Sequence, residues 1–351
     1  VVLGMGISWE KALGAVFISG VLFLFLSFFG FREKLIDSIP DSLKRAIAVG
    51  IGLFVAMIGF QWSGIVVASS GTLVSLGSLH DKPVLLSILG LVFTSILVAA
   101  KVRGSLLWGI FGTALAGLPL GVVKYHGILG GIPSLEPTFF KLDIAGACDL
   151  GLVSVIFVFF FLALFDSVGT LIGVSDQAGF LVNGKLPRAK QALAADAFGS
   201  VAGSVFGTST ITAYVESAAG VVEGGRTGLA NMITGALMLL SLFFYPLARM
   251  IGEGVQMPDG LQIYPVVAPV LIVVGSMMLR NVSRIPWGDT SEAIPAFLTM
   301  TVMPFAFSIT EGIAFGFISY SLLKIVTGKA RDVHGLVYLF AALFVVRYIF
   351  L

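Results

Sequence analysis

Two carboxylates stand inside stretches of the sequence that are otherwise apolar or hydroxyl-rich. Asp166 follows "FFFLALF", and Glu216 follows "TSTITAYV". A lone carboxylate at membrane depth costs roughly 3 kcal/mol unless it is neutral, paired or in a wet cavity. In such a cavity it can accept two parallel N–H···O hydrogen bonds or exchange a proton. We therefore predict that Asp166 and Glu216 belong to a polar binding site.

The segment before Glu216 is predicted to interrupt a helix. Thr208–Tyr214 is rich in β-branched and hydroxyl residues, which are poor helix formers. Non-helical backbone at membrane depth is tolerated where it is buried in protein or lines a polar cavity. A short helix over Val215–Val222 is then expected to begin beside the cavity, with its N-terminal N–H groups near Glu216. Upstream, a predicted ridge of small residues allows close helix approach: Gly199, Gly203 and Gly207.

Both acids also have a plainer interpretation. Asp166 could accept a structural hydrogen bond from a neighbouring hydroxyl or backbone group, and Glu216 could cap a helix in a water-filled vestibule. Among the other charged residues, Glu311 is interpreted as a helix cap rather than a gate, and Asp196 as a packing partner on the ridge helix. Arg347 is expected to extend toward the membrane surface. The three histidines fall in or near loops, so no metal site is predicted.

The surroundings of these acids are those of an integral membrane protein. Apolar residues make up 57% of the chain and charged residues 11%, and the mean hydropathy is +1.04. A helical crossing needs about 20 apolar residues. Eleven candidate crossings are found: Ser8–Phe29, Ser42–Val67, Pro83–Ala100, Ser105–Val123, Leu150–Val174, Arg188–Phe206, Thr227–Met250, Ile263–Leu279, Ile294–Phe307, Ile309–Ile325 and Leu336–Leu351. Because these runs do not alternate, the sequence predicts a polytopic helical bundle and excludes a β-barrel.

Basic residues predict the orientation of the bundle. Lys and Arg are concentrated after the first, third and fifth crossings, so these connections are expected to face the cytoplasm: Arg32, Lys34, Lys44, Arg45, Lys101, Arg103, Lys185, Arg188 and Lys190. The net charge of +2 gives no indication of a nucleic-acid partner, and the single cysteine excludes an internal disulfide.

The chain contains signs of an internal repeat. "ISGVLFLFLSFF" (Ile18–Phe29) aligns with "ITGALMLLSLFF" (Ile233–Phe244), and each is followed by a Pro-Asp-x-Leu element, at Pro40 and Pro258. Two repeats of one unit are common in secondary transporters. If the offset holds, the counterpart of residues 150–214 would lie before Val1. We therefore expect that about 65 residues or more of the first repeat precede this sequence.

Three longer stretches resemble one family. "LFDSVGTLIGVSDQAG", "KLPRAKQALAADAFGSVAGSVFGTSTITAYVESAAGVVEGGRTGL" and "EAIPAFLTMTVMPFAFSITEGIAFGFISY" are similar to signatures of the AzgA-like guanine/hypoxanthine permeases, relatives of the uracil and xanthine permeases. The resemblance implies a fold of fourteen segments in two inverted repeats of seven, with a core and a gate domain. It also implies proton-coupled purine uptake by an elevator-like movement, and a chain that lacks the first two segments and most of the third.

The resemblance also implies a division of the chain and a set of site residues. Residues 1–30 and 150–250 correspond to the core, 31–125 and 251–351 to the gate, and 126–149 to an extracellular loop. Asp166 and Glu216 match the acids that bind or couple substrate. The remaining implied or inferred contacts to the base are Thr170, Thr212, Tyr214 and Ser217, with Phe165 or Tyr214 stacking on the ring.

Guanine suits a carboxylate because its N1–H and amino group form a parallel donor pair. We assign this contact to Glu216 and proton coupling to Asp166, and the two roles are exchangeable because coupled acids titrate together. H+ is preferred over Na+ as the coupling ion, and no cofactor is expected. The expected location is the inner (plasma) membrane, and a homodimer is usual in the wider family. An anion carrier of the same fold and a transport-inactive fragment are the alternatives. The motifs of an intramembrane protease are missing from the sequence, so no enzyme is predicted.

Overall fold

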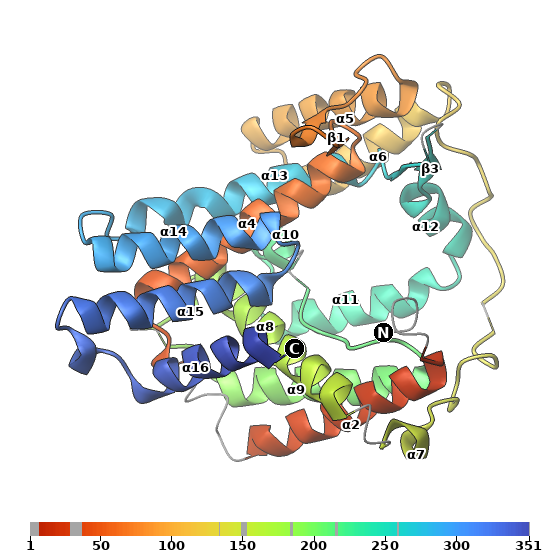
Figure 1. Cartoon of the computed structure of the whole chain (residues 1–351). Coiled ribbons are helices and arrows are strands. Elements are labelled where there is room, and N and C mark those ends of the chain that lie inside the picture. The colour runs from red at the N-terminus through yellow and green to blue at the C-terminus, as the bar shows by residue number, and fades with distance from the viewer. Residues whose placement is uncertain are drawn as a thin grey trace. The chain divides into compact units, whose positions relative to one another are not determined.

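The structure, a computed structural model, describes residues 7–28, 37–132, 134–148, 153–182, 185–214, 217–257 and 260–350. It is almost entirely helical (Figure 1), which confirms the predicted fold class. Four helices of the described residues are long and apolar enough to cross a membrane: α2 (Trp9–Phe28), α4 (Asp41–Trp62), α5 (Lys82–Ala99) and α15 (Ile309–Val326). Helix α8 (Val153–Ala178) has 26 residues, which is also sufficient length.

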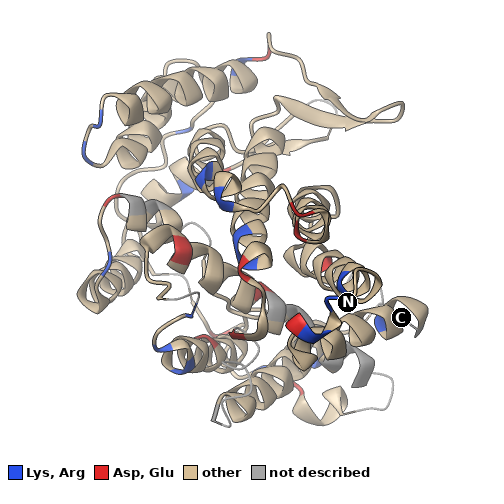
Figure 2. Ribbon diagram, turned by 90° about the vertical axis from the view of Figure 1, so that its left-hand side faces the viewer, with Lys and Arg blue, Asp and Glu red and all other residues tan. Residues whose placement is uncertain are grey.

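The remaining helices follow most of the predicted crossings. These helices are α6 (Ser105–Gly117), α9 (Ala189–Phe206), α11 (Gly228–Ser241), α13 (Ala268–Met278), α14 (Thr290–Phe305) and α16 (Gly335–Phe350). Short helical segments are α7 (Ile144–Ala147), α10 (Ser217–Val222), α12 (Tyr245–Gly252), and the 3-10 helices η2 (Leu279–Arg284) and η3 (Ala330–Asp332). Charged residues are sparse on these ribbons (Figure 2).

Four predicted crossings differ clearly from the structure. Those expected over residues 105–123 and 263–279 are shorter, because α6 ends at Gly117 and α13 begins at Ala268. The other two differ for local reasons. The crossing expected over residues 227–250 is broken into α11 and α12, which meet at 99°. Pro246 lies in the first turn of α12, where its fixed φ and missing N–H favour a new helix start. The crossing expected to reach Val67 ends at Trp62 because Gly64 turns the chain with a φ of 72°. Two small antiparallel pairs complete the structure: β1 (Val66–Ser69) with β2 (Leu73–Leu76), and β3 (Val255–Gln256) with β4 (Gln262–Ile263).

Internal contacts divide the chain into two compact units. The first comprises residues 1–51, 134–215 and 281–351, and the second comprises 52–133 and 216–280. These units are defined by internal contacts alone and do not test the predicted division into core and gate segments, which stays a prediction.

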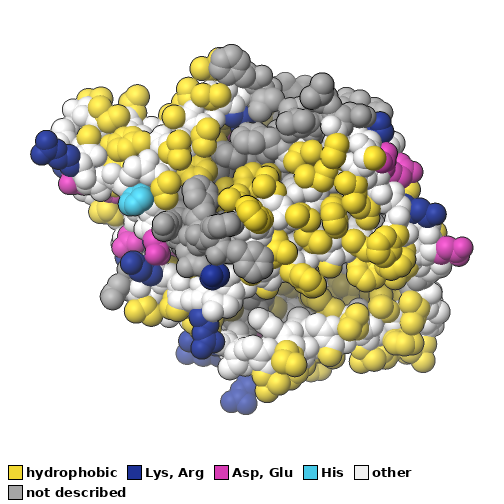
Figure 3. Space-filling view, turned by 90° about the horizontal axis from the view of Figure 1, so that it is seen from below, with side chains coloured by type: hydrophobic (Ala, Val, Ile, Leu, Met, Phe, Trp, Pro, Cys, Tyr) yellow, Lys and Arg dark blue, Asp and Glu magenta, His cyan; other side chains and the backbone are white. Residues whose placement is uncertain are grey.

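In the first unit, α14 packs along α15, α2 packs on α9 and α8, and α15 contacts α16 and α8. A glycine of α2, Gly20, lies directly against α9. A Cβ atom on Gly20 would lie 3.1 Å from the Val201 side chain and 3.3 Å from its backbone nitrogen. Small residues at such positions let helices approach closely in membranes, where apolar burial supplies no driving force. On the face of the molecule seen in Figure 3, hydrophobic side chains cover much of the described surface, as expected for a lipid-facing protein.

In the second unit, α5 and α6 form an antiparallel pair and α13 packs on both. Each helix of the pair places a glycine against a threonine of the other helix. Gly90 of α5 lies against Thr113 of α6, and Gly109 of α6 lies against Thr94 of α5. Glu223, which directly follows α10, accepts a hydrogen bond of 2.9 Å from the backbone N–H of Gly104. It therefore satisfies a donor at the start of α6, a site that favours an acidic group.

Candidate substrate-binding site

Asp166 lies within α8, as predicted, and is partly buried. Its carboxylate accepts a hydrogen bond of 3.0 Å from the hydroxyl of Thr310. Thr310 is in the first turn of α15, whose backbone N–H groups lack partners inside the helix. The Asp166 carboxylate therefore lies beside the N-terminal end of α15.

This arrangement matches the plainer interpretation of Asp166, a hydrogen bond to a neighbouring hydroxyl. A role in binding is compatible with it, because a carboxylate has two oxygens and about four acceptor sites. Thr310 occupies one side of the group and leaves acceptor capacity for a ligand.

The residues around Asp166 on α8 hold it close to three other helices. Ser167 donates a hydrogen bond to Asp196 of α9, which confirms Asp196 as a packing partner. Thr170, one turn after Asp166, is 2% exposed. A Cβ atom on Gly169 would lie within 3.5 Å of side chains from α15 and α4. The helix face that carries the acid is thus fixed by packing on both sides.

The predicted non-helical segment is present. Residues 208–214 form no helix or strand between α9 and the described start of α10. Ser200 of α9 donates a hydrogen bond of 2.6 Å to the carbonyl of Ile211. A Cβ atom on Gly203 would lie 2.5 Å from the Ile211 side chain. The glycine ridge was predicted to receive a neighbouring helix, but at Gly203 it receives this extended segment, because a small residue is needed where backbone and side chain approach so closely.

The other predicted site residues are placed differently. Thr212 is partly buried, Tyr214 is 65% exposed, and Ser217 is an exposed residue at the described start of α10. Glu216 and the side chain of Phe165 lie outside the described residues. The structure thus joins Asp166 to Thr310, and the segment 208–214 to α9. The pairing of Asp166 with Glu216 stays a prediction.

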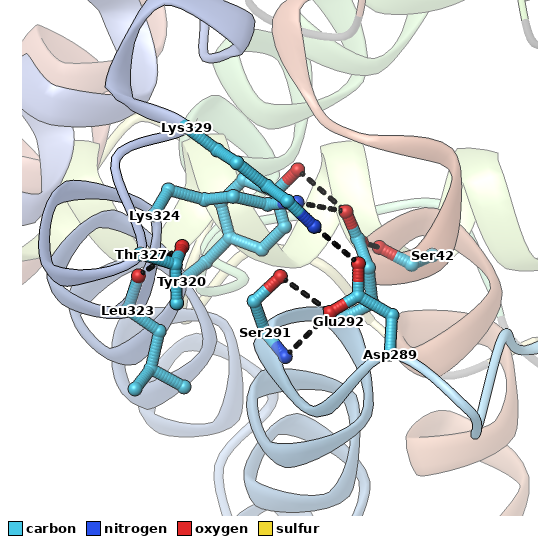
Figure 4. A network of polar contacts seen from close by, with 9 residues as sticks. All are labelled: Ser42, Asp289, Ser291, Glu292, Tyr320, Leu323, Lys324, Thr327 and Lys329. Atoms are coloured by element: carbon cyan, nitrogen blue, oxygen red, sulfur yellow. Dashed lines mark hydrogen bonds and ion pairs between the residues drawn. The ribbon is translucent and has the colours of Figure 1, made fainter.

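A second polar cluster was missed from the sequence (Figure 4). Lys324 Nζ lies 2.5 Å from Glu292 Oε1, and the two side chains are 6% and 18% exposed. Ser42 donates to the other carboxylate oxygen of Glu292, and Tyr320 donates to Oε1 at 3.1 Å. The cluster joins α4, α14 and α15. A lysine inside the apolar run "ISYSLLKIV" was the available signal, since such a residue at membrane depth requires a partner.

At the other end of α15, Glu311 and Arg347 also form a pair. Ser308 caps α15 by accepting from the backbone N–H of Glu311, so Glu311 belongs to the helix cap, as interpreted. Its carboxylate lies 2.7 Å from Arg347 of α16 and accepts a hydrogen bond from Tyr348. The expectation that Arg347 extends to the membrane surface is therefore wrong: an acid within reach holds it against α15. Among the described residues, no group of three or more His, Cys, Asp or Glu side chains could hold a metal ion.

The apolar helices and paired interior charges define a multi-pass membrane protein. Its fold is similar to two solved transporters at low sequence identity. The murine Solute Carrier 26 family member A9 (Slc26a9) anion transporter matches with a TM-score of 0.56 and 14% identity, over 91% of this chain and 52% of that chain. The transmembrane domain of the cyanobacterial bicarbonate transporter BicA matches with a TM-score of 0.50 and 15% identity, over 91% and 75%. The chain thus spans about half the length of the first, and these matches show the fold alone.

Sequence comparison then identifies the family. Residues 1–315 match the Permease family (Xan_ur_permease). The chain is 47% identical to the putative permease MJ0326 of Methanocaldococcus jannaschii, over 98% of this chain and 77% of the relative. It is 45% identical to the guanine/hypoxanthine permease PbuG of Bacillus subtilis, over 98% and 76%, and 45% identical to the adenine permease AdeP of Escherichia coli, over 100% and 77%. The chain belongs to this family of nucleobase permeases, which confirms the resemblance, and the family is one of transporters rather than enzymes.

Proposed function

We propose that this protein carries purine nucleobases across the inner (plasma) membrane, coupled to protons and by an elevator-like movement of its core segments. The observation that carries the proposal is Asp166, a carboxylate inside α8 with one hydroxyl partner and remaining acceptor capacity. Relatives named as guanine/hypoxanthine and adenine permeases support a purine substrate. The expected homodimer belongs to this proposal as well.

The chemistry of the substrate fits the residues assigned to it. A purine base is flat and mostly uncharged, and its N–H edge can donate to a carboxylate. Glu216 is assigned to this edge, with further contacts from Thr170, Thr212 and Ser217. Phe165 or Tyr214 stacks on the ring.

Proton coupling needs an acid that binds a proton when the site faces one side of the membrane and releases it when the site faces the other. Asp166 is assigned to this role because its carboxylate lies inside the apolar helix α8 and accepts a hydrogen bond from the Thr310 hydroxyl, so that proton loading must break or rearrange that hydrogen bond. The Asp166 carboxylate argues against an anion carrier, because an acid at the site would repel an anionic substrate.

Binding of purines to the purified protein tests the proposal. The wild type is expected to be stabilised against heating by guanine, hypoxanthine or adenine, and Asp166→Asn should lose this stabilisation. Asp81→Asn is the matched control, because Asp81 makes no side-chain cap at α5. Equal stabilisation of wild type and Asp166→Asn would remove Asp166 from the site. Stabilisation by sulfate in place of purines would favour the anion carrier.

A further inference from the structure

A polar pocket lies at the connection between α8 and α9, apart from the residues assigned to the purine. It has a volume of about 500 Å³, and its walls are residues 185–191 together with Val182 and Asp37. All of these residues are in the first compact unit. The connection is one of those that the distribution of Lys and Arg assigns to the cytoplasmic side.

Cations outnumber carboxylates around this pocket. Lys185 lies 3.9 Å from Asp37, but the Lys185 side chain is 69% exposed, so this pair is weak. Arg188 and Lys190 are exposed, and neither has a carboxylate within ion-pair distance in the described part of the chain. Three cations and one carboxylate therefore line the pocket, and two of the cations are available to a ligand.

The start of α9 adds backbone donors to the same wall. Arg188 is the N-cap residue and offers no side-chain acceptor to the helix. The first helical hydrogen bond runs from the N–H of Ala192 to the carbonyl of Arg188. The preceding N–H groups of α9, which belong to wall residues 189–191, have no acceptor within the helix. A helix start of this kind favours an anion.

We propose that this pocket binds a phosphate-bearing anion from the cytoplasmic side. A phosphate group offers several acceptor oxygens, which match a guanidinium fork, a lysine ammonium and backbone N–H groups together. The headgroup of an anionic phospholipid and free inorganic phosphate share this chemistry. Basic pockets on the cytoplasmic side of membrane proteins hold such headgroups in general. None of the residues assigned to the purine lines this pocket, so the pocket is separate from the proposed transport site.

Binding of a fluorescent short-chain phosphatidylglycerol to the detergent-purified protein tests the proposal. The variant Arg188→Gln/Lys190→Gln removes the two unpaired cations, and we expect about 30-fold weaker binding, since each basic residue near a surface contributes about fivefold. The matched control is Lys101→Gln/Arg103→Gln, which removes two exposed cations from the connection between α5 and α6. This control should bind as the wild type does.

Competition by inorganic phosphate distinguishes the two sources. If phosphate displaces the probe at millimolar concentration, the pocket recognises the free anion, and if only phosphatidylglycerol displaces it, the pocket recognises the lipid headgroup. Either result supports the proposal when the Arg188→Gln/Lys190→Gln variant has lost binding. Equal weakening in the control variant would show a diffuse attraction to cytoplasmic charge and would overturn the proposal, as would wild-type affinity in the pocket variant.

Discussion

Breaking the ion pair between Glu292 and Lys324 should cost more stability than removing both charges together. The side chains are 18% and 6% exposed, and their contact of 2.5 Å joins the first turn of α14 to the last turn of α15. Removal of one partner of a buried pair leaves an uncompensated charge, which costs about 3–5 kcal/mol. Replacement of both by apolar residues of similar size is often neutral.

The hydroxyl donors of the cluster decide which single change is worse. In Lys324→Met, Glu292 keeps its hydrogen bonds from Ser42 and Tyr320, so the cost should lie near the lower limit, about 3 kcal/mol. In Glu292→Leu, the buried ammonium of Lys324 loses its carboxylate and keeps the Tyr320 ring as a weak partner, so the cost should approach about 5 kcal/mol. The double variant leaves two hydroxyls without their acceptor, at about 1 kcal/mol each.

The order of stability of these variants is measured by heating the detergent-purified proteins and recording the fraction that stays monodisperse. We expect the double variant to have a higher Tm than either single variant. Lys329→Met is the control, because it breaks an exposed pair between Lys329, which follows α15, and Asp289, the N-cap residue of α14, and should change the Tm little. A double variant no more stable than Glu292→Leu would refute the reasoning, because the loss would then come from packing and not from an unpaired charge.

Three further predictions concern the site and the surface. Thr310→Val removes a hydroxyl donor from Asp166 and should shift the pH profile of purine uptake while leaving the fold intact, which uptake from buffers of different pH measures. Gly203→Val should displace the extended segment from α9 and lower both uptake and Tm, with a stability loss of about 1–3 kcal/mol. Asp289→Asn should lower the Tm at neutral pH by more than Lys329→Met does, but not in acid, because the Asp289 carboxylate also accepts hydrogen bonds from the backbone N–H and the hydroxyl of Ser291 at the start of α14. The hydrogen bonds from Lys329 and Ser291 hold the pKa of the Asp289 carboxyl well below its usual range, so its contribution is full above about pH 4 and is lost as the pH falls further.

Each of these predictions has a result that contradicts it. An unchanged pH profile in Thr310→Val would remove the link between Thr310 and the transported proton. Normal uptake by Gly203→Val would show that the extended segment is not positioned by α9, and Gly235→Ala is its control because a Cβ atom at Gly235 meets nothing within 4 Å. A Tm difference between wild type and Asp289→Asn that persists unchanged in acid would show that the aspartate acts through something other than its charge.

Features that depend on neighbours in sequence were predictable. Continuous apolar runs predicted the membrane helices, and the β-branched run after α9 predicted the interruption at residues 208–214, because helix propensity is a local property. The bend between α11 and α12 was also encoded locally, by Pro246, but the apolar run continued through it and concealed it.

Features that depend on tertiary packing were not predictable. Asp166 lies 144 residues before Thr310, and Glu292 lies 250 residues after Ser42, so no pattern along the chain brings either pair together. The same holds for Arg347, whose acid partner lies on another helix. A charged residue in an apolar helix signals that a partner is needed, but only the fold determines which residue it is.

Uptake of radiolabelled hypoxanthine, guanine and adenine into proteoliposomes under an imposed proton gradient tests the central claim most directly. We expect accumulation of at least one of these purines when the outside is acidic, its loss when the gradient is collapsed, and no accumulation by Asp166→Asn under either condition. Gradient-driven accumulation by Asp166→Asn at the wild-type rate would contradict the assignment of this carboxylate, and the absence of uptake of any purine by the wild type would contradict the proposed transport function.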